Sequence, residues 1–260
     1  MPELPEIETI VRGLQETIIG KTVKRLQVLD PLITLPKNKV VGKRISAVER
    51  MGKYIVFHLN PHGSLIFHLR MSGKIMSGCS AGEIKHSRLV LHLDTGALWF
   101  INPRRLGTVE FFEDGFPHAL GPDPTTPEFT PRLLQGILAA SRSPVKTLIM
   151  DQRKISGLGN IYASEALWRA GIDPRRAANS LNTQEASALH RGIVNVLEEA
   201  INHMGTTFSD YHTVDGGSGS FQNFLAVYGK DGEACPRCGR EIKQITQSGR
   251  STYLCPGCQI

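Results

Sequence analysis

The sequence predicts an α+β protein in two parts, a β-sandwich that carries a helix at its amino terminus and a helical region that follows it. Short alternating apolar segments fill residues 20–112, whereas residues 115–131 contain five prolines and the periodicity beyond them is helical. Repeated short strands with brief polar turns favour a sandwich or barrel-like sheet. The 260 residues, 40% of them hydrophobic, are enough for two modest cores.

The first predicted helix covers Pro5–Ile19, places apolar residues at helical spacing, and ends before Gly20. If the initiator Met1 is removed, the chain begins with the secondary amine of Pro2, next to the carboxylate of Glu3. The positive end of the helix favours the neutral amine, which can attack an aldehyde carbon to give a cationic iminium ion. The alternative is that these residues only begin a helix, because proline and acidic residues are favoured in any first turn.

Seven β-strands are expected between this helix and the proline-rich stretch, with Asp94-Thr95-Gly96 as the turn of one hairpin. The expected strands are Thr22–Leu29, Arg44–Val48, Lys53–Leu59, Ser64–Leu69, Arg88–Leu93, Ala97–Asn102 and Thr108–Phe112. The proline-rich stretch, residues 115–131, has the composition of an interdomain linker.

Three helices are expected after the linker. The first opens at Thr130 or Pro131 and runs through Ala140, and the second covers Ile161–Ala170. Asn182 and Glu185 cap the third, a long helix with one continuous apolar face. The glycine-rich segment 209–220 is expected to be a mobile loop.

Cys235-Pro-Arg-Cys238 and Cys255-Pro-Gly-Cys258 are two Cys-x-x-Cys pairs separated by sixteen residues, a spacing typical of a four-cysteine zinc site. Disulfides are the alternative, but the sequence shows no secretory segment, which favours a reducing compartment, where paired knuckles more often hold metal. Four protein ligands leave the ion no open position, so one structural Zn²⁺ is expected. The fifth cysteine, Cys79, has no evident partner.

The net charge of +6 indicates a polyanionic partner only weakly, because many proteins are mildly basic. No apolar run reaches membrane-spanning length, and the first fifteen residues are acidic where a signal peptide is basic. We therefore expect a cytoplasmic protein that does not associate with membranes.

Two polar clusters suggest anion binding. Asn102-Pro103-Arg104-Arg105 places two guanidinium groups directly after a strand, and residues 157–160 place two glycines and Asn160 at a helix entrance, where bare N–H groups suit phosphate. Each cluster also has a structural interpretation: solvated arginines at a strand end, and a glycine that ends one element before an asparagine that caps the next.

Taken together, these motifs resemble those of bacterial formamidopyrimidine-DNA glycosylase, a family that repairs oxidised purines, in one order over the whole chain. The residues that carry the resemblance are Pro2-Glu3-Leu4-Pro5-Glu6, His68-Leu69-Arg70-Met71-Ser72-Gly73, Asn102-Pro103-Arg104-Arg105, Gly157-Leu158-Gly159-Asn160-Ile161-Tyr162-Ala163, Phe221-Gln222 with Val227-Tyr228-Gly229, and the four-cysteine unit with Gly249-Arg250-Ser251-Thr252.

The resemblance implies a two-domain clamp on damaged double-stranded DNA, with a flipped lesion and DNA crossing the cleft between the domains. The implied domains are a catalytic β-sandwich with flanking helices (1–114), a linker (115–131), a helix-two-turn-helix domain with a lesion-covering loop at 206–220 (132–225) and a zinc-bound hairpin (226–260). It further implies a monomer that needs no small-molecule cofactor.

The resemblance also assigns residues. Pro2 is the nucleophile, Glu3 the acid/base residue, Lys53 the β-elimination lysine, and Arg250 the residue for δ-elimination and phosphate contact. Met71 fills the space left by the flipped base, Arg104 faces the orphaned cytosine, and Leu106 stands where the family commonly has a phenylalanine wedge. The other implied DNA contacts are His68, His86, Arg105, Arg142, Lys146, Asn160 and Tyr228.

Two other functions stay open. A relative of endonuclease VIII would share Pro2, Glu3 and the zinc unit but would favour oxidised pyrimidines, and a substrate panel separates it from a purine enzyme. A non-catalytic DNA-binding zinc protein that senses damage is the other; the presence of Pro2, Glu3 and Lys53 argues against it, and a nicking assay decides.

Overall fold

The computed structural model describes residues 1–78, 80, 84–208 and 212–260 and divides into two compact units. Unit 1 comprises residues 1–118 and 203–222, and unit 2 comprises residues 119–202 and 223–260. Cys79 and part of the 206–220 loop lie outside the described residues. No helix in the described part of the chain is long and apolar enough to cross a membrane.

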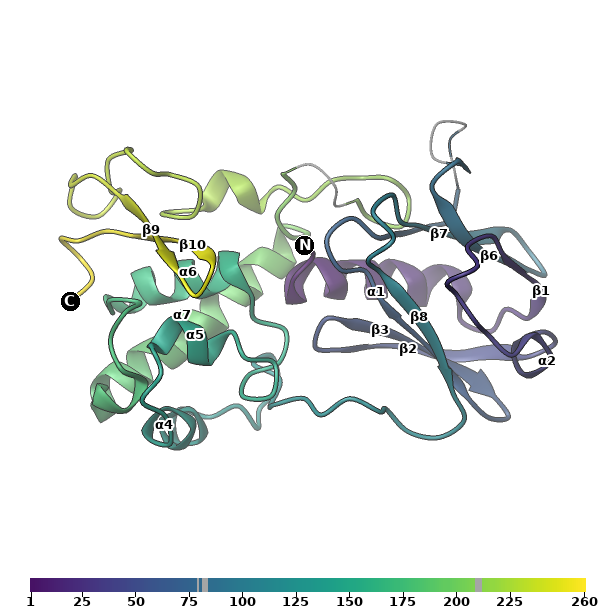
Figure 1. The fold of residues 1–260 in the computed structure, drawn as a ribbon, viewed down its shortest axis with the longest axis horizontal. Helices are drawn as coiled ribbons and strands as arrows, with labels where there is room; N and C mark the ends of the chain where they lie inside the picture. Colours follow the sequence, from purple (N-terminus) through teal and green to yellow (C-terminus); the bar gives the residue numbers. More distant parts are fainter. Residues whose placement is uncertain (79, 81–83, 209–211) are drawn as a thin grey trace. The chain divides into compact units, whose positions relative to one another are not determined.

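Unit 1 contains two antiparallel four-stranded sheets (Figure 1). One sheet has the order β2-β3-β4-β8, formed by Arg44–Met51, Tyr54–Asn60, Ser64–His68 and Thr108–Phe112. The other has the order β1-β6-β7-β5, formed by Val23–Val28, Ser87–Leu93, Ala97–Ile101 and Lys74–Met76. Alternate residues of both sheets enter one core, so the predicted β-sandwich is confirmed.

Helix α1 (Leu4–Ile18) completes the core of unit 1. Its apolar residues Ile7, Ile10, Val11, Leu14 and Ile18 are buried at i, i+3, i+4 and i+7 spacing. Two polar contacts fix its direction against β2: the Arg50 guanidinium pairs with Glu8 at 2.7 Å, and Gln15 donates to the Val48 carbonyl at 2.8 Å. The strand and the helix therefore run in opposite directions, and the end of β2 lies beside the start of α1.

Unit 2 is mainly helical and also contains a two-stranded β-hairpin (Figure 1). Its helices are α4 (Pro131–Ala139), α5 (Val145–Ile149), α6 (Asn160–Ala170) and α7 (Thr183–Asn202). As expected, Asn182 and Glu185 form a reciprocal cap at the start of α7, because each side chain accepts from the other residue's N–H, at 2.9 and 2.8 Å. Thr130 likewise accepts from Leu133 N at 3.2 Å and begins α4.

Strands β9 (Lys243–Gln247) and β10 (Arg250–Leu254) form an antiparallel hairpin that packs on α6. Ser248 and Gly249 have φ of 51° and 71°, the geometry of a type I′ turn, which matches the twist of a two-residue hairpin. The turn leaves Arg250 exposed as the first residue of β10.

Five short elements of the described chain were not expected from the sequence. They are helix α2 (Lys37–Val40), strand β5, helix α5 and two 3-10 helices, η1 (Ala178–Ser180) and η2 (Phe221–Phe224). Each has only three to five residues, which is too short for a hydrophobic period to be recognised. The expected linker is packed at both ends: Phe116 and His118 contact the ring of Tyr54 in unit 1, whereas Gly121 N donates to the Gln152 carbonyl in unit 2.

Candidate functional site

Strand register brings many of the implied site residues of unit 1 to one edge of the β2-β3-β4-β8 sheet. Tyr54 pairs with His68, and His68 pairs with Thr108. The residues just outside these three positions therefore lie along the same edge: Lys53 before β3, the turn that carries Met71 after β4, and the turn that ends at Leu106 before β8. Chain segments far apart in the sequence thus converge on one place.

The amino terminus of α1 lies at this same edge. Gln15, late in α1, contacts Val48, whereas Glu8, early in α1, contacts Arg50, two residues further along β2. Because later residues of the strand meet earlier residues of the helix, Lys53 lies toward the first turn of α1. Glu3 and Lys53 are both buried, at 3% and 5% exposure, and Pro2 is also buried in the chain that still carries Met1. The nitrogen of Pro2, the carboxylate of Glu3 and the ammonium group of Lys53 therefore lie at the same edge of the β2-β3-β4-β8 sheet.

Glu6 is a buried carboxylate beside the predicted site whose contacts the sequence did not reveal. Its carboxylate accepts from Glu3 N at 2.7 Å and from Thr206 N at 2.7 Å, with only 1% of the residue exposed. Gly205 has φ of 81°, and a Cβ there would lie 2.7 Å from the Glu6 carboxylate. Glu6 therefore ties the start of the 206–220 loop to the residue beside Pro2. Its place as the third residue of the helix, where a capping box puts Glu, was the available signal.

His68 is held as a neutral donor. Burial, together with the charges of Arg70, Lys53 and His118, lowers the pKa of His68 to about 3. Its Nδ1 accepts from Arg70 N at 3.0 Å, which leaves the proton on Nε2. At neutral pH His68 is therefore an uncharged hydrogen-bond donor, suited to a phosphate oxygen or a similar acceptor.

Two apolar side chains and two arginines are presented by the turns at this edge. Met71 and Leu106 are 46% and 49% exposed, which is unusual for large apolar residues unless they meet a partner. Arg104 and Arg105 are also exposed, and Arg105 has a left-handed φ of 56° and lies 3.2 Å from the carboxylate of Asp30. The carbonyl of His86 accepts from Asn102 N at the base of the same turn.

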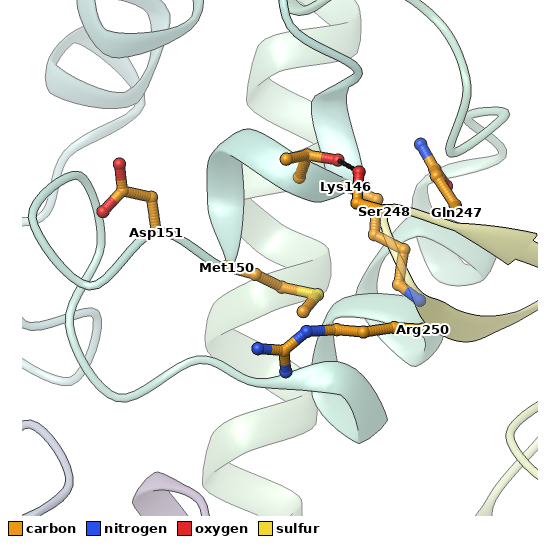
Figure 2. Close-up of a pocket in the computed structure, with 7 residues that line it drawn as sticks. Lys146, Met150, Asp151, Gln247, Ser248 and Arg250 are labelled. Atoms are coloured by element: carbon orange, nitrogen blue, oxygen red, sulfur yellow. Dashed lines mark hydrogen bonds between the residues drawn. The ribbon is translucent and has the colours of Figure 1, made fainter.

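In unit 2, Arg250 lies at a pocket of about 150 Å³ between the tip of the β9–β10 hairpin and α5 (Figure 2). The pocket is lined by Lys146, Thr147, Met150, Asp151, Gln247, Ser248 and Arg250. The hydroxyls of Thr147 and Ser248 are 3.2 Å apart and join the helix to the turn. Figure 2 shows the side chains of Arg250 and Met150 directed toward each other across this pocket.

Lys146 and Asn160 meet beneath this hairpin. The Lys146 ammonium donates to Asn160 Oδ1 at 2.6 Å, to Thr252 Oγ1 at 2.7 Å and to the Ser251 carbonyl at 3.3 Å. Asn160 also donates to the Ser251 carbonyl, at 2.9 Å. With 2% of Lys146 exposed, its charge acts inside unit 2 and braces β10 against α5 and α6. Arg142, in contrast, is exposed between α4 and α5.

Tyr228 is half-buried and stands edge-on to Tyr253 of β10, with ring centroids 5.0 Å apart. The backbone before it is held by Glu165 of α6, whose carboxylate accepts from the N–H groups of Ala226, Val227 and Tyr228, each at 2.9 Å. Sequence reasoning missed Glu165; a charged residue in the apolar run of α6 was the signal for it.

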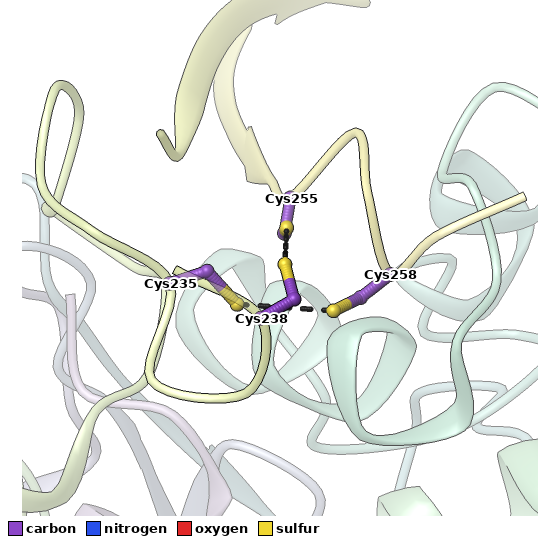
Figure 3. A group of neighbouring side chains, drawn as sticks. All are labelled: Cys235, Cys238, Cys255 and Cys258. Carbon is purple, nitrogen blue, oxygen red and sulfur yellow. Dashed lines mark hydrogen bonds between the residues drawn. The ribbon is translucent and has the colours of Figure 1, made fainter. Parts of the chain in front are cut away.

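The four cysteines cluster as expected (Figure 3). All four sulfur atoms lie within 4.8 Å of one another, with Cys235 and Cys258 at 3.9 Å and Cys238 and Cys255 at 3.4 Å. A tetrahedral zinc with Zn–S bonds of about 2.3 Å places sulfurs about 3.8 Å apart, so the cluster fits one ion. Trp168 donates from its indole N–H to Cys235 at 3.4 Å, which supports a thiolate ligand.

Three family models match the chain. The formamidopyrimidine-DNA glycosylase N-terminal domain matches residues 1–109, and the H2TH domain of the same glycosylase matches residues 120–212. A zinc finger found in FPG and IleRS matches residues 232–260.

Individual relatives cover the whole chain. A formamidopyrimidine-DNA glycosylase of Paracoccus denitrificans is 41% identical over 100% of both chains. The MutM (Fpg) protein of Thermus thermophilus has a TM-score of 0.92 at 38% identity, covering 99% of this chain and 98% of that one. The Fpg of Lactococcus lactis, 35% identical over 99% of both chains, has been solved with abasic-site DNA and, as a mutant, with Fapy-dG DNA, at TM-scores of 0.90 and 0.91.

A β-sandwich with a buried amino-terminal site, an H2TH domain and a four-cysteine zinc finger together define a DNA-repair glycosylase of the H2TH class. Within that class, the chain belongs to the formamidopyrimidine-DNA glycosylase family.

Proposed function

We propose that this protein is a base-excision-repair DNA glycosylase with AP lyase activity, and that it removes oxidised purines such as 8-oxoguanine and formamidopyrimidines from double-stranded DNA. The observation that carries the proposal is the convergence of Pro2, Glu3 and Lys53 with Met71 and Leu106 at one edge of the sheet. That edge combines groups for covalent chemistry with exposed apolar side chains able to enter a base stack. We further propose that it acts as a monomer in the cytoplasm, on nucleoid DNA.

The chemistry begins with the Pro2 nitrogen, once Met1 is removed. Its lone pair forms a bond to C1′ of the flipped nucleotide, and the bond between C1′ and the base breaks, so the base leaves with the electron pair. The proline nitrogen then loses its N–H proton, and the departing base takes up one proton. Glu3 donates the proton that opens the sugar ring. Nitrogen and C1′ then share an iminium double bond, which has no N–H to lose and withdraws electrons from C2′.

Elimination follows from that iminium. Loss of a C2′ proton expels the 3′ phosphate in β-elimination, a step we assign to Lys53. A second elimination expels the 5′ phosphate, and we assign this δ-step to Arg250, which stabilises the departing phosphate. Water finally hydrolyses the imine and restores the proline amine. Each step moves protons and a leaving group, and the structural zinc takes no part.

The proposed DNA-binding residues differ in the chemical group that each presents and in its burial. His68 offers a neutral N–H donor, and Arg105, Arg142, Arg250, Asn160 and Tyr228 supply charged or polar groups for phosphates. Because the Lys146 ammonium is buried, we propose that Lys146 acts by holding Asn160 and β10 in place. Met71 would occupy the space left by the flipped base, Leu106 would wedge between bases, and Arg104 would read the opposite base.

Borohydride trapping tests the covalent step. Reduction during reaction with an 8-oxoguanine duplex should join the protein to DNA, and peptide mapping should place the sugar on residue 2. Pro2→Gly should trap with a much lower yield, whereas Pro5→Ala, at the next proline of the same turn, should trap normally. A cross-link that maps to Lys53, or a mature protein that keeps Met1, contradicts the assignment, because an acylated proline nitrogen is not a nucleophile.

A substrate panel tests the lesion class. Duplexes with 8-oxoguanine, formamidopyrimidine or thymine glycol should be cleaved with the two purine lesions strongly preferred. Preference for thymine glycol would instead indicate an enzyme like endonuclease VIII, and binding without any strand cleavage would indicate a damage sensor.

A further inference from the structure

The turn at residues 102–107, between β7 and β8, carries Arg104, and any role of this turn in base recognition rests on the proposal that Arg104 reads the opposite base. The turn is fixed at its base. Arg105 N donates to the Asn102 carbonyl at 3.2 Å. Gly107 lies so close to the backbone of β4 that a Cβ there would approach the His68 carbonyl to 3.0 Å. Arg104 itself lies in the exposed part of the turn, beyond these contacts.

Arg88 on β6 holds the two carbonyls that precede Arg104. Its Nε donates to the Asn102 carbonyl at 2.9 Å, and its Nη2 donates to the Pro103 carbonyl at 3.4 Å. Only 11% of the Arg88 side chain is exposed. A guanidinium buried to this degree is stable only beside an anionic partner, because carbonyl groups alone do not balance its charge.

Asp30 supplies that charge from the loop after β1. The residue is 3% exposed, and its Oδ2 lies 3.6 Å from Arg88 Nε and 3.2 Å from Arg105 Nε. Its Oδ1 accepts from Leu32 N at 3.1 Å, which fixes the carboxylate in one orientation. The N–H of Asp30 also donates to the Arg88 carbonyl, so backbone and side chain both join the two residues.

The two ion pairs of Asp30 differ in burial. The pair with Arg88 is almost fully buried, whereas Arg105 is 53% exposed and its pair is open to solvent. An exposed pair contributes little, while removal of one partner of a buried pair leaves an uncompensated charge. The buried series of contacts, from Asp30 to Arg88 and from Arg88 to the carbonyls of residues 102 and 103, therefore contributes most to holding the 102–107 turn in place.

We propose that Asp30 is a positioning residue for opposite-base recognition. It holds the guanidinium of Arg88, Arg88 holds the carbonyls of Asn102 and Pro103, and those carbonyls set the direction in which the chain presents Arg104. Asp30 touches neither the lesion nor the opposite base. Its charge decides how sharply cytosine is distinguished from adenine, because two hydrogen bonds to one base edge need a fixed donor.

The test compares single-turnover excision rates for 8-oxoguanine paired with cytosine and with adenine, both measured on the same preparation of each variant. The ratio of the two rates cancels losses of folded enzyme, which lower both rates equally. If Arg104 is the reader, the normal enzyme should prefer cytosine by about 5- to 150-fold. Asp30→Asn removes the charge at nearly constant size and should bring this ratio down by about fivefold or more, toward unity.

Three variants control the comparison. Asp94→Asn makes the same change at an exposed aspartate that caps the hairpin at the other end of β7, and should leave the ratio unchanged. Asp30→Glu keeps the charge, and a groove of about 320 Å³ beside Asp30 has room for the longer side chain, so much of the ratio should return. Arg105→Ala removes only the outer pair and should weaken binding without changing the ratio.

The outcomes separate this inference from the function on which it rests. Arg104→Ala with a normal ratio means that the reader lies elsewhere and contradicts the proposed role of Arg104. A flattened ratio in Arg104→Ala with a normal ratio in Asp30→Asn overturns the role of Asp30 alone. Should Asp30→Asn fail to fold, Arg88→Lys decides, because lysine keeps the charge without the fork that holds two carbonyls. A normal ratio in Arg88→Lys would then overturn the inference.

Discussion

The carboxylate of Glu165 accepts the N–H of Tyr228 at 2.9 Å, and it accepts the two preceding N–H groups at the same distance. Glu165 is 0% exposed, so one buried carboxylate of α6 satisfies three consecutive donors where the chain re-enters unit 2 ahead of the zinc-finger segment. Burial raises the pKa of Glu165, and the three N–H groups oppose that rise by favouring the ionised form. The junction is thus fixed by charge-assisted hydrogen bonds.

Glu165→Gln should lower the free energy of unfolding by about 2 to 4 kcal/mol. The amide has one oxygen and one NH₂ group, so at least one backbone N–H faces a donor in place of an acceptor. Urea unfolding monitored by tryptophan fluorescence measures the loss, since Trp168 lies on the same helix. Glu198→Gln, in the exposed part of α7, is the matched control and should change stability little. Equal stability of the two variants would show that the three hydrogen bonds do not hold the junction.

The second prediction concerns zinc. The core around the zinc finger contains only Val227, Cys235, Ile242 and Cys255 among the described buried residues, and two of these are ligands, so the hairpin lacks an apolar core of its own. Chelation or Cys238→Ser should therefore abolish DNA binding and cleavage together, measured by fluorescence anisotropy and by nicking. Cys79→Ser, at a cysteine outside the zinc-finger segment 232–260, should do neither. Normal binding by a chelated enzyme that cannot cleave would point to a catalytic metal.

His68 gives a third prediction, on pH. With a folded pKa of about 3 and an unfolded value of about 6.5, the unfolded chain binds more protons between these values. The contribution of neutral His68 is complete above about pH 6.5 and is lost as pH falls toward 3, with a slope of at most about 1.4 kcal/mol per pH unit. His68→Gln should flatten the decline in unfolding free energy between pH 7 and pH 4.

Urea titrations at several pH values check this slope. Because His68 stays neutral from pH 6 to 8, DNA affinity should show no titration due to this residue in that range. An unchanged slope in His68→Gln would mean that His68 is not held neutral by burial.

Sequence patterns predicted the long elements well and the short ones poorly. The seven expected strands and the capped helix α7 are present, because each has enough residues to show a period or a complete cap. Strand β5 and helix α5 exist only through pairing and packing with distant segments, which no local window contains. The same reason explains Glu165 and Asp30: their partners lie far along the chain in each case, and burial alone makes those charges important.

The site was predicted in a comparable way. The resemblance identified Pro2, Glu3 and the arginines by their positions in the sequence, without placing them in space. The strand register then showed that Lys53, His68 and the 102–107 turn meet at one edge of the sheet. Lys146 is the instructive difference. The resemblance implied a DNA contact for Lys146, and in the structure its ammonium is enclosed by Asn160, Ser251 and Thr252. Whether a lysine faces solvent or the interior depends on tertiary packing, which the sequence does not display.

The last prediction concerns the opposite base and the wedge. A guanidinium can donate two hydrogen bonds to the acceptor edge of cytosine, so pairing the lesion with adenine should cost about 1 to 3 kcal/mol. Arg104→Ala should lower the excision rate on lesion·C duplexes and flatten the preference for C over A.

A substitution at Leu106 tests whether recognition of the opposite base is independent of the apolar wedge in the base stack. It is 49% exposed and apolar, and it offers no hydrogen bond to either base, so it can support the stack without reading it. Leu106→Phe should keep the preference for C and tighten the complex, because an aromatic face stacks better than an aliphatic one. Single-turnover rates with each of the four bases opposite 8-oxoguanine, together with binding titrations, make the comparison. If Leu106→Phe changes the preference for C while Arg104→Ala does not, the reader is at position 106, and the roles of the two residues are reversed.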